Sequence, residues 1–396
     1  MRPSSLLLTA ITALALPASQ AEPAFDPGRA PLWHVPGAAR GTPAFDGTTA
    51  YFLSRDREVV AIDAARGTVR WRAGTGVTST DDIFGATTAG TRLTLAGPLV
   101  VGGDWDVVAF DRASGERRWT YTAPAGDGPG LFLGPAAGDT VFAGSPGGHV
   151  YALDTRSGRP RWITTIEDRD PASVFPPVLH GDLVVVGFSV YVNPSVGGLA
   201  ALDAATGRLR WRTMFPPARE RWQHTNVAGG PIVVDDVVIG SAGDSNLYAV
   251  DLATGALRWT FPALTDLPEQ IPGVPPLSTD FDHRAIVLAG RLLVAGSATG
   301  VVVAYDLDTR RERWRFYDRA AGSTMFWFAA DDRLVYVPYF GGFVVALDVA
   351  TGVERWRTGD FTKGFIWPPL PAGDRLFLGG AYAGFQALSL IAPETP

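Results

Sequence analysis

The stretch Ala201-Leu-Asp-Ala-Ala-Thr-Gly-Arg-Leu-Arg-Trp211 recurs with small changes along the chain of 396 residues. In seven places an Asp is followed eight positions later by a Trp, and six of these seven copies carry a Gly midway. The tryptophans of successive copies lie 42 to 55 residues apart. A period of roughly 40–50 residues is typical of repeat proteins, in which each repeat is one supersecondary unit that stacks on its neighbours.

Each copy predicts two strands joined by a tight turn. The Asp follows a short apolar run such as Val107-Val-Ala-Phe110, which is typical of a buried strand. The Asp side chain accepts backbone N–H groups of the turn, and Gly adopts a positive φ without a steric penalty. The sixth copy has Arg310 in place of the Gly, so we expect either a strained backbone or a different turn there.

A second pair of strands precedes each copy, as in residues 232–239, which gives four strands per repeat. A four-stranded sheet cannot bury both of its faces alone, and radial stacking of such sheets covers them. A Trp at one fixed place in every repeat is suited to wedge neighbouring sheets together. The predicted docking tryptophans are Trp33, Trp71, Trp119, Trp162, Trp211, Trp259, Trp314 and Trp356.

The two ends of the chain carry parts of one further motif. Residues 375–388 match the front of an eighth copy, but Ser389 replaces the Asp, and Pro31-Leu-Trp33 matches a final strand with its Trp. Joining the two parts removes the exposed sheet edges. The sequence therefore predicts an all-β fold, a single eight-bladed β-propeller of four-stranded antiparallel blades, with the ring closed by a blade shared between the N- and C-termini.

These motifs resemble those of the pyrroloquinoline-quinone (PQQ)-type, quinoprotein-like propeller superfamily. Its tryptophan-docking motif has the form Ala-x-Asp-x-x-Thr-Gly-x-x-x-Trp, and residues 201–211 match every specified position. The resemblance implies eight blades over nearly the whole chain. It implies less about function, because the superfamily includes quinoprotein dehydrogenases, the scaffold lipoprotein of outer-membrane barrel assembly, and secreted propellers.

The N-terminus and the composition suggest an exported protein. Residues 1–21 predict a cleavable signal peptide with Arg2, an apolar stretch that is too short to span a membrane, and a small-residue cleavage site at Ala21. We expect residues 22–396 to form the propeller, secreted or periplasmic, monomeric and without a transmembrane segment. The chain has no Cys, so we expect no lipid anchor, no c-type haem and no thiolate metal site. A net charge of −6 favours no nucleic-acid partner.

One face of the ring is expected to carry the function. The Asp-to-Gly turns and the first hairpins are short and nearly constant, whereas residues 187–198, 215–227 and 261–283 form long connections that we place on the opposite face of blades four to six. Loops that lengthen on a constant scaffold often carry function. The alternative is that they are merely tolerated insertions.

Aromatic and polar residues on these connections suit a small-molecule pocket. The predicted ligand-binding residues are Tyr191, Asn193, Trp222, Gln223, Asn226, Trp327, Lys363 and Trp367. The predicted catalytic residues are His224 and His283 as acid or base and Asp282 as the orienting carboxylate. Each also has a structural interpretation: a loop His is often only solvated, the non-docking tryptophans can plug the channel, and Lys363 can be a plain surface residue. Three potential ligands on one loop do not suffice to predict a metal site.

Three functions remain open at this point. The favoured one is an exported binding or scaffold module that holds a protein or a small ligand on its variable face, because no catalytic motif is recognisable. The second is a lyase, cyclase or hydrolase that uses the funnel of the propeller. The third, implied by the resemblance, is a dehydrogenase dependent on PQQ and calcium. Its adjacent-Cys pair cannot exist in this chain. Neither cofactor is therefore favoured, and whether the protein is an enzyme stays open.

Overall fold

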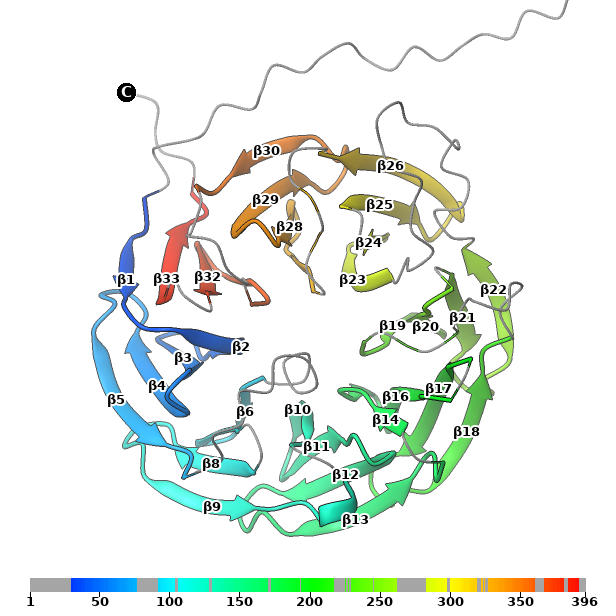
Figure 1. The fold of residues 1–396 in the computed structure, drawn as a ribbon, viewed down its shortest axis with the longest axis horizontal. Coiled ribbons are helices and arrows are strands. Elements are labelled where there is room, and N and C mark those ends of the chain that lie inside the picture. The colour runs from blue at the N-terminus through cyan, green and yellow to red at the C-terminus, as the bar shows by residue number, and fades with distance from the viewer. Residues whose placement is uncertain are drawn as a thin grey trace, which may run out of the picture.

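The computed structural model describes residues 30–76, 92–103, 106–127, 130–169, 172–192, 194–216, 225, 227, 229–244, 246–261, 283–297, 300–318, 322, 324, 327–359, 367–380 and 384–391. Their strands form eight antiparallel sheets that surround a central axis like the blades of a propeller (Figure 1). In the described ranges no helix has the length and apolarity needed to cross a membrane. The predicted fold class is confirmed, while the signal-peptide prediction concerns residues outside these ranges.

Blades 1 to 4 follow one another along the chain, each running from its innermost strand to its outermost. Blade 1 contains β2 (Ala39–Phe45), β3 (Thr49–Ser54), β4 (Glu58–Asp63) and β5 (Val69–Gly74). Blade 2 contains β6 (Thr94–Ala96), β7 (Leu99–Gly102), β8 (Val107–Asp111) and β9 (Arg117–Tyr121). Blade 3 contains β10 (Phe132–Ala137), β11 (Thr140–Gly144), β12 (His149–Asp154) and β13 (Pro160–Thr165). Blade 4 contains β14 (Ala172–Val174), β15 (Val178–His180), β16 (Leu183–Val190), β17 (Val196–Asp203) and β18 (Leu209–Met214).

The remaining blades continue the same pattern around the ring. Blade 5 contains β19 (Ile232–Val234), β20 (Val237–Ser241), β21 (Leu247–Asp251) and β22 (Leu257–Phe261). Blade 6 contains β23 (His283–Ala289), β24 (Leu292–Ser297), β25 (Val301–Asp306) and β26 (Arg311–Tyr317). Blade 7 contains β27 (Ala329–Ala330), β28 (Leu334–Tyr339), β29 (Phe343–Asp348) and β30 (Glu354–Arg357). Blade 8 contains β31 (Leu370–Ala372), β32 (Arg375–Gly380), β33 (Gly384–Ser389) and β1 (Trp33–Val35).

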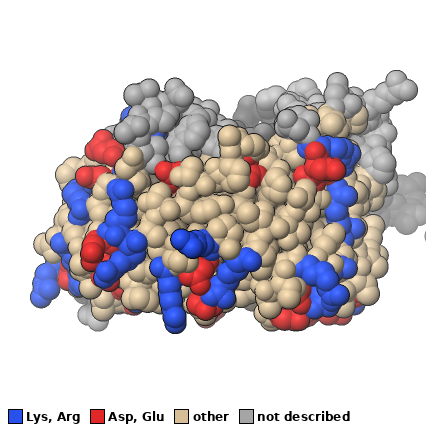
Figure 2. All heavy atoms as spheres, turned by 90° about the horizontal axis from the view of Figure 1, so that it is seen from below, with Lys and Arg blue, Asp and Glu red and all other residues tan. Residues whose placement is uncertain are grey.

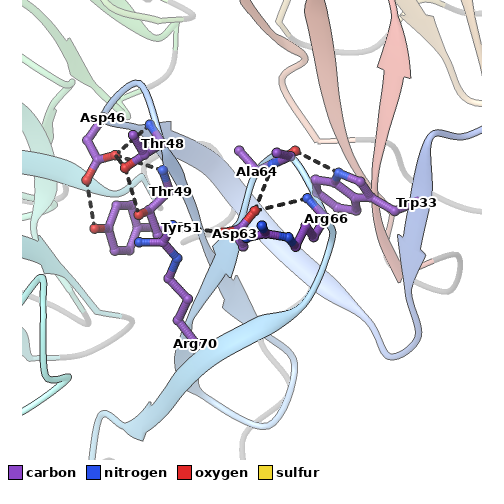
Figure 3. Close-up of polar contacts among 10 residues, drawn as sticks. Trp33, Asp46, Thr48, Thr49, Tyr51, Asp63, Ala64, Arg66 and Arg70 are labelled. Carbon is purple, nitrogen blue, oxygen red and sulfur yellow. Dashed lines mark hydrogen bonds and ion pairs between the residues drawn. The ribbon is translucent and has the colours of Figure 1, made fainter.

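Blade 8 joins the two ends of the chain, as the sequence predicts. The N-terminal strand β1 is its outermost strand and pairs with the C-terminal strand β33, with Trp33 opposite Ala387 and Val35 opposite Phe385. The Trp33 indole then donates a 2.8 Å hydrogen bond to the carbonyl of Ala64 in blade 1 (Figure 3). The ring is therefore closed both by strand pairing and by a side chain.

The hydrophobic core lies between the blades and is distributed around the ring. In β11 and β20 every residue is buried, because both faces of each middle strand are covered by neighbouring sheets. One core cluster combines Val101 of blade 2 with Val141 and Leu153 of blade 3, and the other clusters combine adjacent blades in the same way. Burial of apolar surface therefore stabilises the stacking of blades.

The docking tryptophans join successive blades through their indole N–H groups. Each of six indoles donates to the carbonyl of the residue that follows the motif Asp of the next blade. These bonds are Trp33 to Ala64 at 2.8 Å, Trp71 to Arg112 at 2.9 Å, Trp119 to Thr155 at 2.7 Å, Trp162 to Ala204 at 3.1 Å, Trp211 to Leu252 at 2.8 Å and Trp314 to Val349 at 2.7 Å. The same indoles lie against the motif glycines, so a Cβ at Gly207 would come within 2.5 Å of Trp162.

The sixth motif keeps its turn although it lacks the Gly. Arg310 adopts a φ of 55°, which is the left-handed conformation that glycine adopts in the other copies. Its guanidinium lies over the ring of Trp259, 5.7 Å from the centroid. The expected backbone strain is therefore present at Arg310, and the side chain makes a cation–π contact with the docking tryptophan.

The motif aspartates organise their turns and also bind an arginine that the sequence analysis did not single out. In Figure 3, Asp63 accepts the backbone N–H of Arg66 at 3.0 Å and the guanidinium of Arg70 at 2.9 Å. Equivalent pairs place an arginine seven residues after the Asp and directly before the docking Trp: Asp111 with Arg118, Asp154 with Arg161, Asp203 with Arg210, Asp251 with Arg258 and Asp348 with Arg355. Acidic and basic side chains consequently alternate along the outer wall in Figure 2.

The long connection predicted at residues 187–198 is only partly a loop. Strands β16 and β17 stay paired through Gly187 opposite Leu199 and as far as Val190 opposite Val196, so most of the predicted connection is part of the two strands. The length of this segment suggested a long turn, but its glycines are accommodated within paired strands. Here the missing Cβ is needed, since a Cβ at Gly198 would lie 2.1 Å from the Thr213 carbonyl oxygen. The extra residues therefore lengthen the hairpin of blade 4.

Replacing a motif glycine tests the docking contact. Gly207 and Gly181 have φ values of 70° and 58°, but a Cβ at Gly181 meets nothing within 4 Å. We expect Gly207→Ala to lower the free energy of unfolding by about 2–4 kcal/mol, from backbone strain plus the clash with Trp162. Gly181→Ala should cost only about 1 kcal/mol, because it introduces the strain alone. Urea denaturation of both variants measures the difference, and equal losses would contradict a role for the indole contact.

Acid should weaken the motif turns. Hydrogen bonds from Thr254 and from Arg258 hold the pKa of Asp251 at about 2, and the equivalent bonds from Thr206 and Arg210 hold the pKa of Asp203 at about 2. A carboxyl group whose pKa is lower in the folded state stabilises that state above its ordinary pKa, and this contribution disappears as pH falls toward 2. We expect the thermal midpoint to fall between pH 4 and pH 2, and Asp203→Asn to reduce this dependence. Asp56→Asn is the control, because Asp56 has no hydrogen bond or ion pair within the described ranges. An equal change in both variants would refute the assignment.

Candidate functional site on the crossover face

The two faces of the ring are distinguished by backbone contacts. The residue after each motif Asp bonds to the first hairpin of its own blade, as Thr155 does to Asp139 and Leu252 to Asp236, both at 2.8 Å. We call this side the motif face. The opposite side, which carries the second–third turns and the blade-to-blade connections, is the crossover face. The long connections predicted to carry function start or end on the crossover face.

The hairpin of blade 4 places exposed apolar residues at the edge of this face. Tyr191 and Val192 lie at its tip with exposed fractions of 43% and 41%. The predicted ligand-binding residue Tyr191 is therefore accessible. Its turn is closed by a 3.0 Å hydrogen bond from the Ser195 hydroxyl to the Val192 carbonyl. Exposed aromatic and aliphatic side chains at one hairpin tip are suited to contact another molecule.

The chain after blade 4 supports the base of this hairpin. Ser189 Oγ donates to the carbonyl of Val227 at 3.0 Å and accepts its backbone N–H at 2.8 Å. The backbone N–H of Thr225 donates to Ser195 at 3.0 Å, and that of Phe215 donates to Gly197 at 2.9 Å. These bonds tie the lengthened part of the hairpin to the next connection. The base of the hairpin is thus held on both of its strands.

An ion cluster around the buried carboxylate of Glu167 links further parts of blade 4. Arg169 binds Glu167 through two hydrogen bonds of 2.8 Å, and Arg212 of β18 forms a second ion pair with the same carboxylate. These guanidinium contacts hold the pKa of the Glu167 carboxyl at about 2. The Arg212 guanidinium also lies 4.8 Å from the centroid of Phe188 in β16. The cluster links the connection from blade 3 to the outer strand and the hairpin of blade 4.

A second buried carboxylate, Asp127, orients a histidine on the crossover face of blade 3. Asp127 accepts hydrogen bonds from the Ser145 hydroxyl at 2.8 Å and from the Tyr151 hydroxyl. His149 contacts the same carboxylate through Nδ1 at 2.5 Å, and its side chain is 29% exposed. Only Nε2 of this ring remains for another partner. Sequence analysis missed His149, because its 22-residue separation from Asp127 follows no local motif.

The structure brings two of the predicted ligand-binding tryptophans together. Trp327 and Trp367 stack with 5.8 Å between ring centroids and 20° between planes. Trp367 is buried, its backbone N–H donates to Gly379, and its indole donates to the carbonyl of Ala39 in blade 1. The Trp367 indole therefore takes part in packing between blades 8 and 1, at the junction of the two chain ends.

The other predicted site residues are not placed. His224, Asp282, Asn193, Trp222, Gln223, Asn226 and Lys363 lie outside the described residues, and for His283 only the backbone position at the start of β23 is described. The predicted catalytic group therefore stays a prediction. In the parts of the chain that the structure describes, no cluster of three or more His, Asp or Glu side chains is arranged to hold a metal ion.

Comparison with known proteins agrees with the fold and the motif. The family model described as "Outer membrane protein assembly factor BamB" matches residues 23–174, 172–316 and 298–391. BamB of Burkholderia pseudomallei is 30% identical over 171 residues, which cover 39% of this chain and 40% of that protein. Polyvinylalcohol dehydrogenase of a Sphingopyxis species is 26% identical over 252 residues, covering 47% of this chain and 37% of the enzyme.

A solved structure extends the likeness of the fold. BamB from Moraxella catarrhalis superposes with a TM-score of 0.66 at 17% identity and covers 91% of this chain and 99% of its own. By sequence, the chain spans about two fifths of the length of the curated relatives named above. The three segments matched by the family model together include nearly all of the described strands. The chain therefore belongs to the BamB family of PQQ-repeat β-propellers.

Proposed function

We propose that this protein is a binding scaffold of the cell envelope that holds a partner protein on its crossover face. The observation that carries the proposal is the lengthened hairpin of blade 4 with Tyr191 and Val192 exposed at its tip. The family likeness supports it, since the matching relatives are named as outer membrane protein assembly factors. The predicted signal peptide supports an exported location, secreted or periplasmic.

The geometry of the tip suits protein binding. A tyrosine next to an aliphatic residue offers large contact area at low cost in side-chain entropy. The ion cluster at Glu167 and the bonds of Ser189 fix the hairpin before a partner arrives. Preorganisation of this kind reduces the entropy lost on association. Tyr191 and Val192 are therefore the residues that we expect to contact the partner directly.

Site-specific crosslinking tests this proposal. A photoreactive amino acid at position 191 should crosslink the full chain to one envelope protein in the producing cells. The same amino acid at position 257 is the control, because Leu257 is 46% exposed but lies on β22, near the motif face. Crosslinks to the same proteins at both positions, or none at 191, would contradict the assignment of the hairpin.

Affinity for the identified partner gives the quantitative test. We expect the double variant Tyr191→Ala, Val192→Ser to weaken binding by roughly 10- to 100-fold, mainly through faster dissociation, as for central interface residues. The matched variant Leu209→Ser, Leu257→Ser should bind as the wild type does. Both should retain the wild-type thermal midpoint closely, because all four side chains are exposed. Unchanged affinity in the double variant would remove the hairpin from the interface.

A further inference from the structure

Arg92 lies at the inner rim of the ring, between the innermost strands of blades 1 and 2. It forms a parallel bridge with Thr42 of β2, and the following residue, Leu93, donates its backbone N–H to the Thr42 carbonyl at 3.0 Å. Strand β6 begins at Thr94, whose hydroxyl donates a 2.8 Å hydrogen bond to the carbonyl of Gly134 in blade 3. Figure 1 shows β2 and β6 on the axial side of their blades. The backbone at Arg92 is therefore fixed on the axial side of the ring, where blades 1, 2 and 3 approach one another.

The guanidinium of Arg92 has no counter-charge among the residues that the structure describes. Its Nε atom is fully buried without a hydrogen-bond partner, and within the described ranges the side chain makes no ion pair. Arg92 as a whole is partly exposed, and its two terminal nitrogens are not among the fully enclosed atoms that lack a partner. By contrast, Arg212 and Arg357, whose side chains are also only partly exposed, each form ion pairs with carboxylates.

An enclosed cation without a partner is energetically unfavourable. Burial lowers the pKa of the Arg92 guanidinium, yet this group remains protonated at any pH at which proteins are folded. A buried polar group that keeps no hydrogen bond loses its hydration without compensation, and the cost is larger for a charge. Replacement of an uncompensated buried charge by an apolar side chain of similar size is therefore expected to be neutral or stabilising.

We propose that Arg92 is the anchor of a binding site for a small oxyanion, a carboxylate or a phosphate, on the axial side of the junction between blades 1 and 2. A guanidinium presents parallel N–H groups that match two oxygens of such a group. The site lies on the innermost strands, whereas the exposed hairpin tip lies on blade 4. The anion site is thus separate from the proposed protein-binding surface.

Titration of the full chain with succinate and, separately, with inorganic phosphate tests the proposal, at constant ionic strength in a buffer without other oxyanions. We expect a saturable rise in the thermal midpoint of the wild type, because a ligand that binds only the folded state stabilises it. Arg92→Met should abolish the rise. Arg66→Met is the control, since the side chain of Arg66 is 78% exposed on the motif face, and it should respond as the wild type does.

The midpoint of Arg92→Met without added anion is a second readout. We expect it to equal or exceed that of the wild type, because the variant removes an uncompensated charge. A rise with succinate alone would identify a carboxylate ligand, and a rise with phosphate alone a phosphate-bearing one. The proposal is overturned if neither anion gives a saturable rise, if Arg92→Met responds equally, or if the variant has a lowered midpoint in anion-free buffer, as after loss of an internal ion pair.

Discussion

The contact between a docking indole and the turn of the next blade is the constraint on which the rest of this structure depends. A blade exposes two apolar faces, and neither is covered until a neighbour stacks on it. The indole ring fills the space above the motif Gly, and its N–H group binds the carbonyl next to the motif Asp. Trp33 makes this contact across the junction of the chain ends, so the ring closes with the same hydrogen bond that is described at five other blade junctions.

This constraint explains why the connections that differ in length between blades lie on one face of the ring. Each motif turn must fit an indole from the preceding blade, so its length cannot change without loss of that contact. The crossover face carries no such requirement, and blade 4 extends its second and third strands there by continued pairing up to Val190 and Val196. In a paired hairpin the backbone N–H and C=O groups bond to each other across the strands. In an open loop of the same length these groups would have to bond to water instead.

The fold could be predicted because its motifs repeat along the sequence. Much of the candidate site could not be predicted, because its contacts join residues that no local motif connects. The Asp-to-Trp spacing predicts the blades, the docking residues and the strain at Arg310, since each depends on neighbours within one motif and its successor. The ion pair of Glu167 with Arg212 and the bond from Trp367 to Ala39 join residues that are 45 and 328 positions apart. Such contacts depend on how blades approach one another, which no spacing in the sequence encodes. The same holds for Gly197 and Gly198, where a Cβ would meet backbone atoms of neighbouring segments that the sequence does not place beside them.

The docking contact also explains why proteins with different named functions resemble this chain. Proteins named as an assembly factor and as a polyvinylalcohol dehydrogenase both match this chain, and any propeller stacked by docking indoles must share the Ala, Asp, Gly and Trp positions of the motif. Similarity concentrated on these positions reports the requirements of the ring, because a fold can carry many functions. Residues outside the motif are free of those requirements. The exposed side chain of Tyr191 and the Arg92 guanidinium, which has no counter-charge among the described residues, lie outside the docking motif, and we propose that both contact molecules other than this chain.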